Sequence, residues 1–288
     1  MRVQLLGLCR FSYLGGRGFQ VEHPSLDARR AFLYDPARLA RRWHWFENVT
    51  LPAFRAQTDP DFTLVVMTGP DLPEPWMSRL RAVEAEIPQL RLSLVEPMDQ
   101  HFPACQRAVE PFRDPRADVV GHFRQDDDDA VAVDFIEHAR RDFAMVETAC
   151  ARHDGAAIDY MRGLVLRTSP RGMKVTPRMI FGATAALVVY LPPEDRRTAV
   201  HLPHWRIGEI VPTLTLGAVP MFCRTISGDN DSGDEGAGHP WVEPPEDPVR
   251  LLRERFRLDR WALNHDAKAM LGSDARAATA CRPAGPSI

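Results

Sequence analysis

The sequence predicts an α/β fold, with a mostly parallel sheet and helices on both of its faces. The first half of the chain alternates short apolar runs with stretches of helical periodicity, as parallel strands joined by helices do. The apolar runs are nearly continuous, which is typical of strands buried on both faces. The 288 residues are 44% hydrophobic and 26% charged, which supplies enough apolar material for one sizeable core.

Four strands are predicted in the first half, at residues 3–9, 62–67, 90–95 and 118–124. Between the first two, Asp35 and Pro36 are the residue types that begin a helix, as the N-cap and the first helical residue. The polar face of this helix is expected to carry Arg38, Arg41 and Arg42.

Two further helices are predicted from apolar residues at helical spacing. The first ends at Pro88 and has a stripe made of Trp76, Leu80, Val83 and Ile87. The second covers residues 130–143 and begins directly after the strand at 118–124.

The second half is less regular and is expected to contain strands of a mixed sheet at 158–167 and 180–191, and a helix at about 248–256. Residues 228–248 are rich in Gly, Pro and acidic residues, which predicts a mobile loop. We expect one domain over residues 1–275, with a donor half at about 1–150 and an acceptor half at about 151–275. Residues 276–288 have little to bury and are expected to be disordered.

The composition argues against several classes of protein. The formal net charge is −3, so no basic excess indicates nucleic acid as a partner. No run of about 18 uncharged apolar residues predicts a membrane span, and the apolar N-terminus fits a first strand better than a signal peptide. The 5 cysteines are widely spaced, which supports neither a disulfide framework nor a zinc site and fits free thiols in the cytoplasm.

Four consecutive carboxylates, Asp126 to Asp129, follow the strand at 118–124. Ligands of parallel α/β sheets bind at the carboxyl ends of the strands, so this run is placed where a ligand would lie. Two such charges 4 Å apart repel by roughly 4 kcal/mol at an effective dielectric of about 20. A helix N-terminus offsets only about 0.3–1 kcal/mol per charge. The run therefore predicts a divalent cation, Mn²⁺ or Mg²⁺, with Asp126 and Asp128 as a natural pair of ligands.

A second interpretation of the run needs no metal. Asp128 or Asp129 would cap the helix predicted to follow, and the remaining carboxylates would be solvated. A non-catalytic binding module would fit this second interpretation. A metal-dependent phosphohydrolase is an alternative under the first interpretation, because it would bind its metal with the same acids.

Three stretches, at residues 8–14, 56–66 and 123–131, resemble the bacterial rhamnosyltransferase family. An Asp-x-Asp motif at the end of a strand is also similar to the signature of GT-A glycosyltransferases. The family usually has an apolar residue where this chain has Gln125. The resemblance implies a GT-A-like fold, which is a Rossmann-like nucleotide-diphospho-sugar transferase. It also implies transfer of a sugar from a nucleoside-diphosphate donor to a glycan or lipid-linked saccharide, with peripheral membrane association as an option.

The resemblance also implies roles for the acidic run. Asp126, Asp128 and Asp129 would be the metal ligands, with Asp128 the principal one and Asp129 alternatively a contact to the donor sugar. Asp126 and Asp127 would contact the donor. The late His-x-x-Asn-like element of such enzymes corresponds here to 227–232, which lacks histidine, so the third ligand stays open. His204, from the stretch His-Leu-Pro-His, is a candidate.

The remaining candidates come from the residues themselves. Arg10 and Arg124 lie at the ends of strands, beside the predicted crevice, and each is a candidate contact to the donor. The alternative for Arg10 is a surface arginine, and the alternative for Arg124 is a structural ion pair with one of the acids. An inverting reaction would need a general base, and a retaining one would not. The eligible carboxylates are Glu209, Asp229 and Asp195, and the sequence selects none of them. Three tryptophans in irregular segments are candidates for stacking on an acceptor sugar: Trp205, Trp241 and Trp261.

Overall fold

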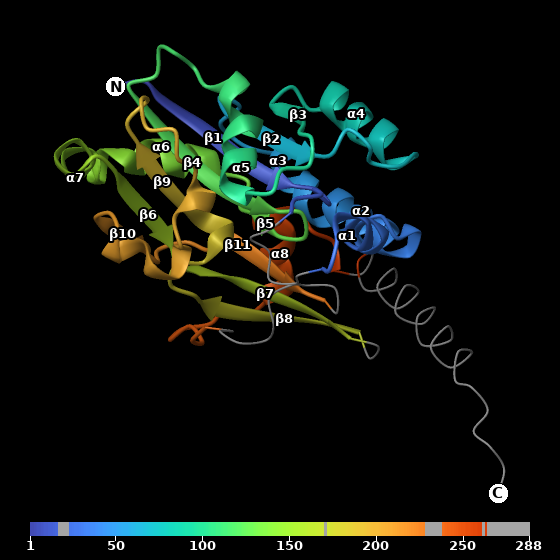
Figure 1. Cartoon of the computed structure of the whole chain (residues 1–288). Helices are drawn as coiled ribbons and strands as arrows, with labels where there is room; N and C mark the ends of the chain where they lie inside the picture. Colours follow the sequence, from blue (N-terminus) through green and yellow to red (C-terminus); the bar gives the residue numbers. More distant parts are fainter. Residues whose placement is uncertain (17–22, 170–171, 228–237, 261–262, 264–288) are drawn as a thin grey trace, which may run out of the picture.

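The structure is a computed structural model that describes residues 1–16, 23–169, 172–227, 238–260 and 263. Its described residues form a seven-stranded sheet in the order β10-β6-β9-β4-β1-β2-β3 and a four-stranded sheet in the order β5-β11-β7-β8. Figure 1 shows the smaller sheet, with β7 and β8, below the larger one. The predicted tail at 276–288, residues 228–237 of the predicted loop (with Asp229 among them) and Trp261 lie outside the described residues.

The four strands predicted in the first half are confirmed. They are β1 (Val3–Arg10), β2 (Thr63–Thr68), β3 (Leu90–Leu94) and β4 (Val119–Asp126). All neighbouring pairs among them are parallel. Consequently, the carboxyl ends of β1 and β4 meet at one edge of the sheet, where Arg10 pairs in register with Asp126.

Helices cover both faces of the large sheet, as predicted. The helix expected after Asp35 is α2 (Pro36–Trp45), and the Asp35 side chain accepts a hydrogen bond from the Arg38 amide. The stripe of Trp76 to Ile87 lies on α4 (Trp76–Glu86). The other helices in chain order are α1 (Leu26–Leu33), α3 (Leu51–Arg55), α5 (His101–Val109), α6 (Phe135–Asp142), α7 (Glu147–His153) and α8 (Pro248–Phe256).

The helix predicted at 130–143 is wrong at its beginning. Ala130 and Val131 form a short strand, β5, which pairs antiparallel with β11 (Phe222–Ile226), and α6 begins only at Phe135. The Asp129 amide donates to the Asp126 carbonyl at 3.2 Å, so the acidic run makes a turn. Ala130 and Val131 are fully buried against β11, which no local periodicity could indicate.

The strand predictions of the second half are partly wrong. Residues 158–167 form two strands, β6 (Ala156–Tyr160) and β7 (Arg162–Ser169), which belong to different sheets and are separated only by Met161. Only the end of 180–191 is a strand, β9 (Leu187–Leu191). Besides β5, three strands were not predicted: β8 (Gly172–Met179), β10 (Thr213–Leu216) and β11. Of these, β8 and β10 lie at sheet edges, where β8 tolerates Pro177.

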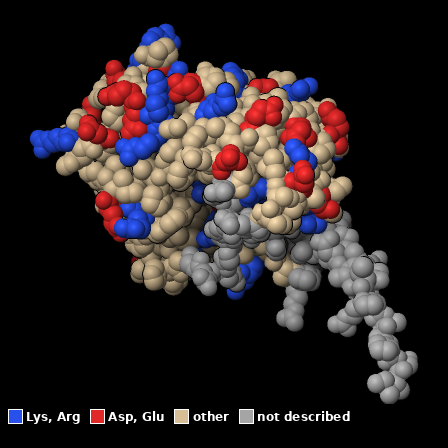
Figure 2. All heavy atoms as spheres, in the orientation of Figure 1, with Lys and Arg blue, Asp and Glu red and all other residues tan. Residues whose placement is uncertain are grey.

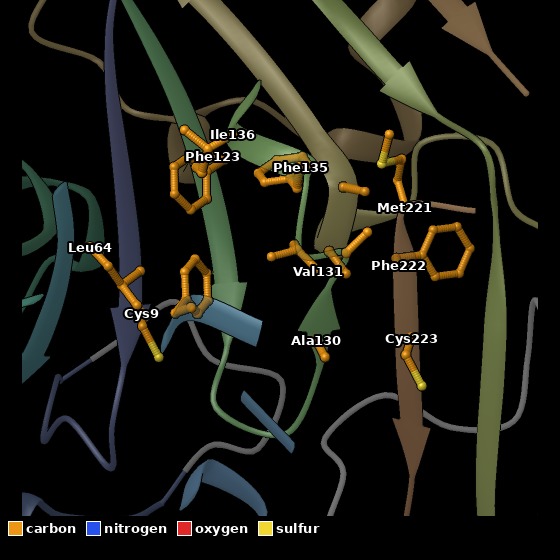
Figure 3. Close-up of a cluster of buried hydrophobic side chains, with 14 of the residues drawn as sticks. Cys9, Leu64, Phe123, Ala130, Val131, Phe135, Ile136, Met221, Phe222 and Cys223 are labelled. Carbon is orange, nitrogen blue, oxygen red and sulfur yellow. The ribbon is translucent and has the colours of Figure 1, made fainter. Parts of the chain in front are cut away.

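One hydrophobic cluster fills the space between the two sheets (Figure 3). Phe123 of β4 and Leu64 of β2 belong to it, as do Val131 of β5 and Phe222 of β11. The opposite face of the large sheet is covered by α5 and by the segment around 199–211. Strand residues of alternate number therefore point to two different layers, and this alternation decides which polar side chains meet at the carboxyl edge.

Within the described residues, no helix combines the length and the apolar character needed to cross a membrane. Acidic and basic side chains are interspersed over the face of the molecule shown in Figure 2.

Candidate active site

Asp126 ends β4 and is held by two arginines. The Arg124 guanidinium donates to its carboxylate from Nε and Nη2, both at 2.9 Å, and Arg10 Nη2 lies 3.7 Å from Oδ1. Burial by itself would raise the pKa of Asp126, but the Arg124 and Arg10 charges outweigh it and lower that pKa. With a side chain that is 29% exposed, Asp126 is the carboxylate of the run that faces the crevice.

Arg42 of α2 neutralises the next two carboxylates. It forms ion pairs with Asp127 and, at 3.0 Å, with Asp128. All three side chains are at most 10% exposed, so the acids are neither solvated nor caps of the following helix. Burial raises the pKa of Asp128, and Arg42 opposes that rise. The prediction that Arg42 belongs to the polar face of its helix is wrong, because the acidic turn covers it.

Asp129 and the backbone of the turn are fixed from three sides. The Asp129 carboxylate accepts the Thr225 amide of β11 at 2.8 Å. The Gln125 amide donates to the carbonyls of Asp126 and Asp129 at 2.9 and 2.7 Å, and the Thr50 hydroxyl donates to the latter at 2.9 Å. Burial, followed by the charges of Asp128 and Asp126, raises the pKa of Asp129 well above its ordinary value. Gln125, which departs from the family pattern, therefore braces the turn.

Arg10 is held from its other side by a histidine that sequence reasoning did not identify. Arg10 Nη1 donates to His101 Nε2 at 3.1 Å, and Cys105 Sγ lies 3.5 Å from the same nitrogen. Burial, then the charges of Arg10 and Arg124, lowers the pKa of His101 to about 3, so the ring is neutral and can accept. Arg10 is thus placed between His101 and Asp126.

A further carboxylate, Asp159, lies at the same edge of the sheet. It is two strands from β4, near the carboxyl end of β6, and its neighbour in register is Leu187 of β9. Its Oδ2 accepts the Gly182 amide at 2.9 Å. Among the described residues nothing hydrogen-bonds its buried Oδ1. Burial raises the pKa of Asp159 to about 6.

The two histidines of the His-Leu-Pro-His stretch have different environments. His201 Nδ1 accepts the Thr198 amide at 3.1 Å and so holds its own turn. His204 Nδ1 donates to the Gly182 carbonyl at 2.6 Å. Burial lowers the pKa of both histidines; the charges of Arg124 and Asp126 also act on His204, whereas those of Arg197 and Asp195 act on His201.

Of the three carboxylates considered as general bases, the two in the described part of the chain, Glu209 and Asp195, form ion pairs elsewhere. Glu209 is 61% exposed and pairs with Arg206. Asp195 pairs with Arg197, and its carbonyl accepts Arg113 Nη2 at 2.6 Å. Asp159 was missed because it lies inside an apolar strand, where a single carboxylate gives no pattern.

A pocket of about 490 Å³ lies among the segments that follow β1 and β3, at the carboxyl edge of the large sheet. The loops that follow these strands are joined by a hydrogen bond from the Gly16 amide to the Met98 carbonyl at 2.9 Å. The pocket is lined by Gly16, His23, Pro24, Ser25, Leu26, Arg29, Pro97, Met98 and Asp99. Its place beside the strand that ends in Arg10 makes it a candidate binding site for part of a donor.

The residues fit a metal that is shared with a ligand. In the described part of the chain, no group of three or more His, Cys, Asp or Glu side chains is placed to hold a metal ion. Mg²⁺ in phosphate-transfer sites commonly uses one or two carboxylates together with substrate phosphates. Asp126, at the crevice and 29% exposed, provides such a carboxylate, whereas Asp129 is bound to the backbone of β11.

The acidic turn of this α/β protein thus lies at the carboxyl end of a central parallel strand and is faced by arginines. The family model described as "Putative rhamnosyl transferase" matches residues 4–239, and the chain belongs to this family. No curated protein matches the sequence.

Several solved structures share part of the architecture. S. aureus TarS 1-349 matches with a TM-score of 0.40 at 10% identity, over 77% of this chain and 60% of that chain. Its complex with UDP-GlcNAc matches with a TM-score of 0.39 at 14% identity, over 88% of this chain and 65% of that chain. An rv0371c homolog from mycobacterium sp. strain JC1 matches with a TM-score of 0.33 at 12% identity, over 77% and 90% of the two chains. This chain spans less than two thirds of these TarS chains.

Proposed function

We propose that the protein transfers a sugar, rhamnose by the name of its family, from a nucleoside-diphosphate donor to a glycan or lipid-linked saccharide. The observation that carries this proposal is the meeting of Arg10, Arg124 and Asp126 at the carboxyl edge of the sheet, the edge at which the 490 Å³ pocket also lies. Two guanidinium groups can bind the oxygens of a diphosphate, and the pocket supplies space for the nucleoside.

The donor's leaving group gains negative charge during transfer, and fixed positive charge at that place lowers the barrier. Arg10 and Arg124 provide it and orient the diphosphate, while His101 fixes the direction of Arg10. When bound, a Mn²⁺ or Mg²⁺ ion would add charge stabilisation, with Asp126 as the first ligand and Asp128 as the second. Asp127 and Asp129 hold the turn in shape through Arg42 and Thr225.

The proposed setting is the cytoplasm, where nucleotide sugars would be available. The four cysteines in the described part of the protein are buried and form no disulfide, which fits a reducing compartment: Cys9, Cys105, Cys150 and Cys223. A lipid-linked acceptor would bring the enzyme to a membrane surface as a peripheral protein.

Nucleotide binding is tested by thermal unfolding with UDP, GDP or dTDP, each with and without Mn²⁺. A nucleotide at about 100 times its dissociation constant should stabilise the protein by about 2.7 kcal/mol. This stabilisation should require Mn²⁺ and be lost in Asp126→Asn. The control Asp61→Asn changes a carboxylate that is 87% exposed and should keep it. If none of the three nucleotides stabilises the wild type, or if sugar nucleotides release inorganic phosphate and not the diphosphate, the proposal fails.

A further inference from the structure

We propose that His204 is the general base that removes the proton from the acceptor hydroxyl, and that Gly182 and Asp159 position it. The proposal rests on the transferase function above and adds to it an inverting stereochemical outcome. It assigns catalysis to a residue from the second half of the chain, next to an acidic site built from the first half.

His204 lies between Leu202 and Ile207, which pack against the face of the large sheet opposite the small sheet. It is partly buried, and its ring is hydrogen-bonded to Gly182, whose amide donates to Asp159 near the carboxyl end of β6. Arg124 and Asp126 are two residues apart on one strand, so their side chains lie on one face of the sheet. Asp159 is on the same face, because its register neighbour Leu187 belongs to the layer that includes the 199–211 segment. The base thus stands over the face where the diphosphate would bind.

The Gly182 carbonyl fixes the tautomer of the His204 ring. A carbonyl oxygen only accepts, so the 2.6 Å hydrogen bond places a proton on Nδ1. In the neutral ring the lone pair is then on Nε2, which is the atom that must accept the acceptor's proton. Burial, opposed by this bond and reinforced by the charges of Arg124 and Arg224, lowers the pKa of His204, which keeps the ring neutral at pH 7.

Residue 182 has to be glycine for this contact to form. Its φ of +62° is in the left-handed region, and a Cβ there would lie 2.5 Å from the His204 carbonyl oxygen. Its amide donates to Asp159 at 2.9 Å, while its carbonyl accepts from the ring. One backbone unit therefore connects a buried carboxylate to the imidazole and sets the position of both.

In the transfer step, the proton of the acceptor and the electron pair of the broken bond each go to a group already described. The acceptor O–H gives its proton to His204 Nε2 as the acceptor oxygen bonds to the anomeric carbon. The bond from that carbon to the diphosphate oxygen breaks on the opposite side, and its electron pair leaves with the diphosphate toward Arg10 and Arg124. The imidazolium keeps its Nδ1 proton in the hydrogen bond to the Gly182 carbonyl. The Nε2 proton then passes to water.

Two exposed aromatic side chains stand where the acceptor would approach. Trp205 is 71% exposed and Phe181 is 61% exposed, and each directly adjoins one member of the Gly182–His204 contact in sequence. The Trp205 ring packs edge-on against the His204 ring, with centroids 5.0 Å apart. Large aromatic rings in water beside a base provide apolar surfaces against which the C–H face of a sugar can rest. The acceptor class that fits is a saccharide.

The test compares wild type with His204→Gln and Gly182→Ala, with the exposed His153→Gln as the control. The first measurement is release of nucleoside diphosphate from dTDP-rhamnose and from UDP-GlcNAc, with water as the acceptor. His204→Gln should lower the rate by about 10²–10⁴-fold and remove the acidic limb of its pH profile. Gly182→Ala should also slow release, and His153→Gln should leave it unchanged.

Two further readouts separate this inference from the transferase proposal. Stabilisation by Mn²⁺ with UDP, GDP or dTDP should be the same in His204→Gln as in wild type, because the donor site is intact. A long-range ¹H–¹⁵N spectrum should show the His204 ring protonated at Nδ1. Release within threefold of wild type in His204→Gln, or a ring protonated only at Nε2, overturns the assignment of the base. Absence of nucleotide stabilisation in wild type overturns the transferase function itself.

Discussion

Replacing Arg42 with methionine is expected to lower the free energy of unfolding by about 3–5 kcal/mol. The substitution keeps most of the side-chain volume and removes the positive charge that pairs with both Asp127 and Asp128. Both carboxylates are at most 6% exposed, so they would remain buried without the Arg42 charge. Urea unfolding followed by circular dichroism gives the value directly.

A matched control is available at the surface. Arg55→Met breaks an ion pair with Glu86 whose members are 33% and 55% exposed, and such pairs contribute about 0–1 kcal/mol. Adding Asp127→Asn and Asp128→Asn to Arg42→Met should restore part of the lost stability, because the two carboxylates that Arg42 paired with then carry no charge. If Arg42→Met costs no more than Arg55→Met, the acidic turn does not depend on Arg42.

Replacing Asp159 with asparagine is expected to stabilise the protein at neutral pH. The pKa of Asp159 is raised from 3.8 to about 6 in the folded protein. The folded state therefore binds the Asp159 proton more tightly than the unfolded state does. The stability that this proton contributes is fully present below pH 3.8 and is lost as the pH rises through 6. The difference between these pKa values corresponds to about 3 kcal/mol. Asparagine cannot ionise and should avoid that loss.

The measurement is urea unfolding of Asp159→Asn and wild type from pH 4 to pH 8. The stability gap should be small at pH 4 and grow to at most about 3 kcal/mol in favour of the variant above pH 6. Asp61→Asn, at a carboxylate that is 87% exposed, should change stability little. If Asp159→Asn is instead less stable than wild type at pH 8, the ionised carboxylate is a structural acceptor. If the variant is more stable, as expected, the wild-type carboxylate lowers the stability of the protein at neutral pH, which is typical of residues at functional sites.

The strands and helices that could be predicted from the sequence are those that depend on local patterns of residues. Continuous apolar runs located β1, β2 and β4, and residue types at the helix ends located α2 and α8. The acidic run was expected at the carboxyl end of a strand, and the structure places it there. Each of these features depends on residues within about ten positions of one another.

The remainder depends on contacts between distant residues. β5 is a strand because β11, some 90 residues later, pairs with it. Arg42 has the sequence context of a surface arginine, and only the packing of α2 against the acidic turn buries it. Asp159 and His204 are 45 positions apart and meet through the backbone of Gly182, so neither has a partner that can be recognised nearby in the sequence.

The passage of the chain from β6 to β7 has a mechanical consequence. Only Met161 separates a strand of the large sheet from a strand of the small one, and a single hydrophobic cluster fills the space between the sheets. A hinge between them would have to expose that cluster to water, at about 25 cal/mol for each Å² of apolar surface. The two sheets are therefore expected to behave as one rigid block, which holds the acidic turn in a fixed position against β11.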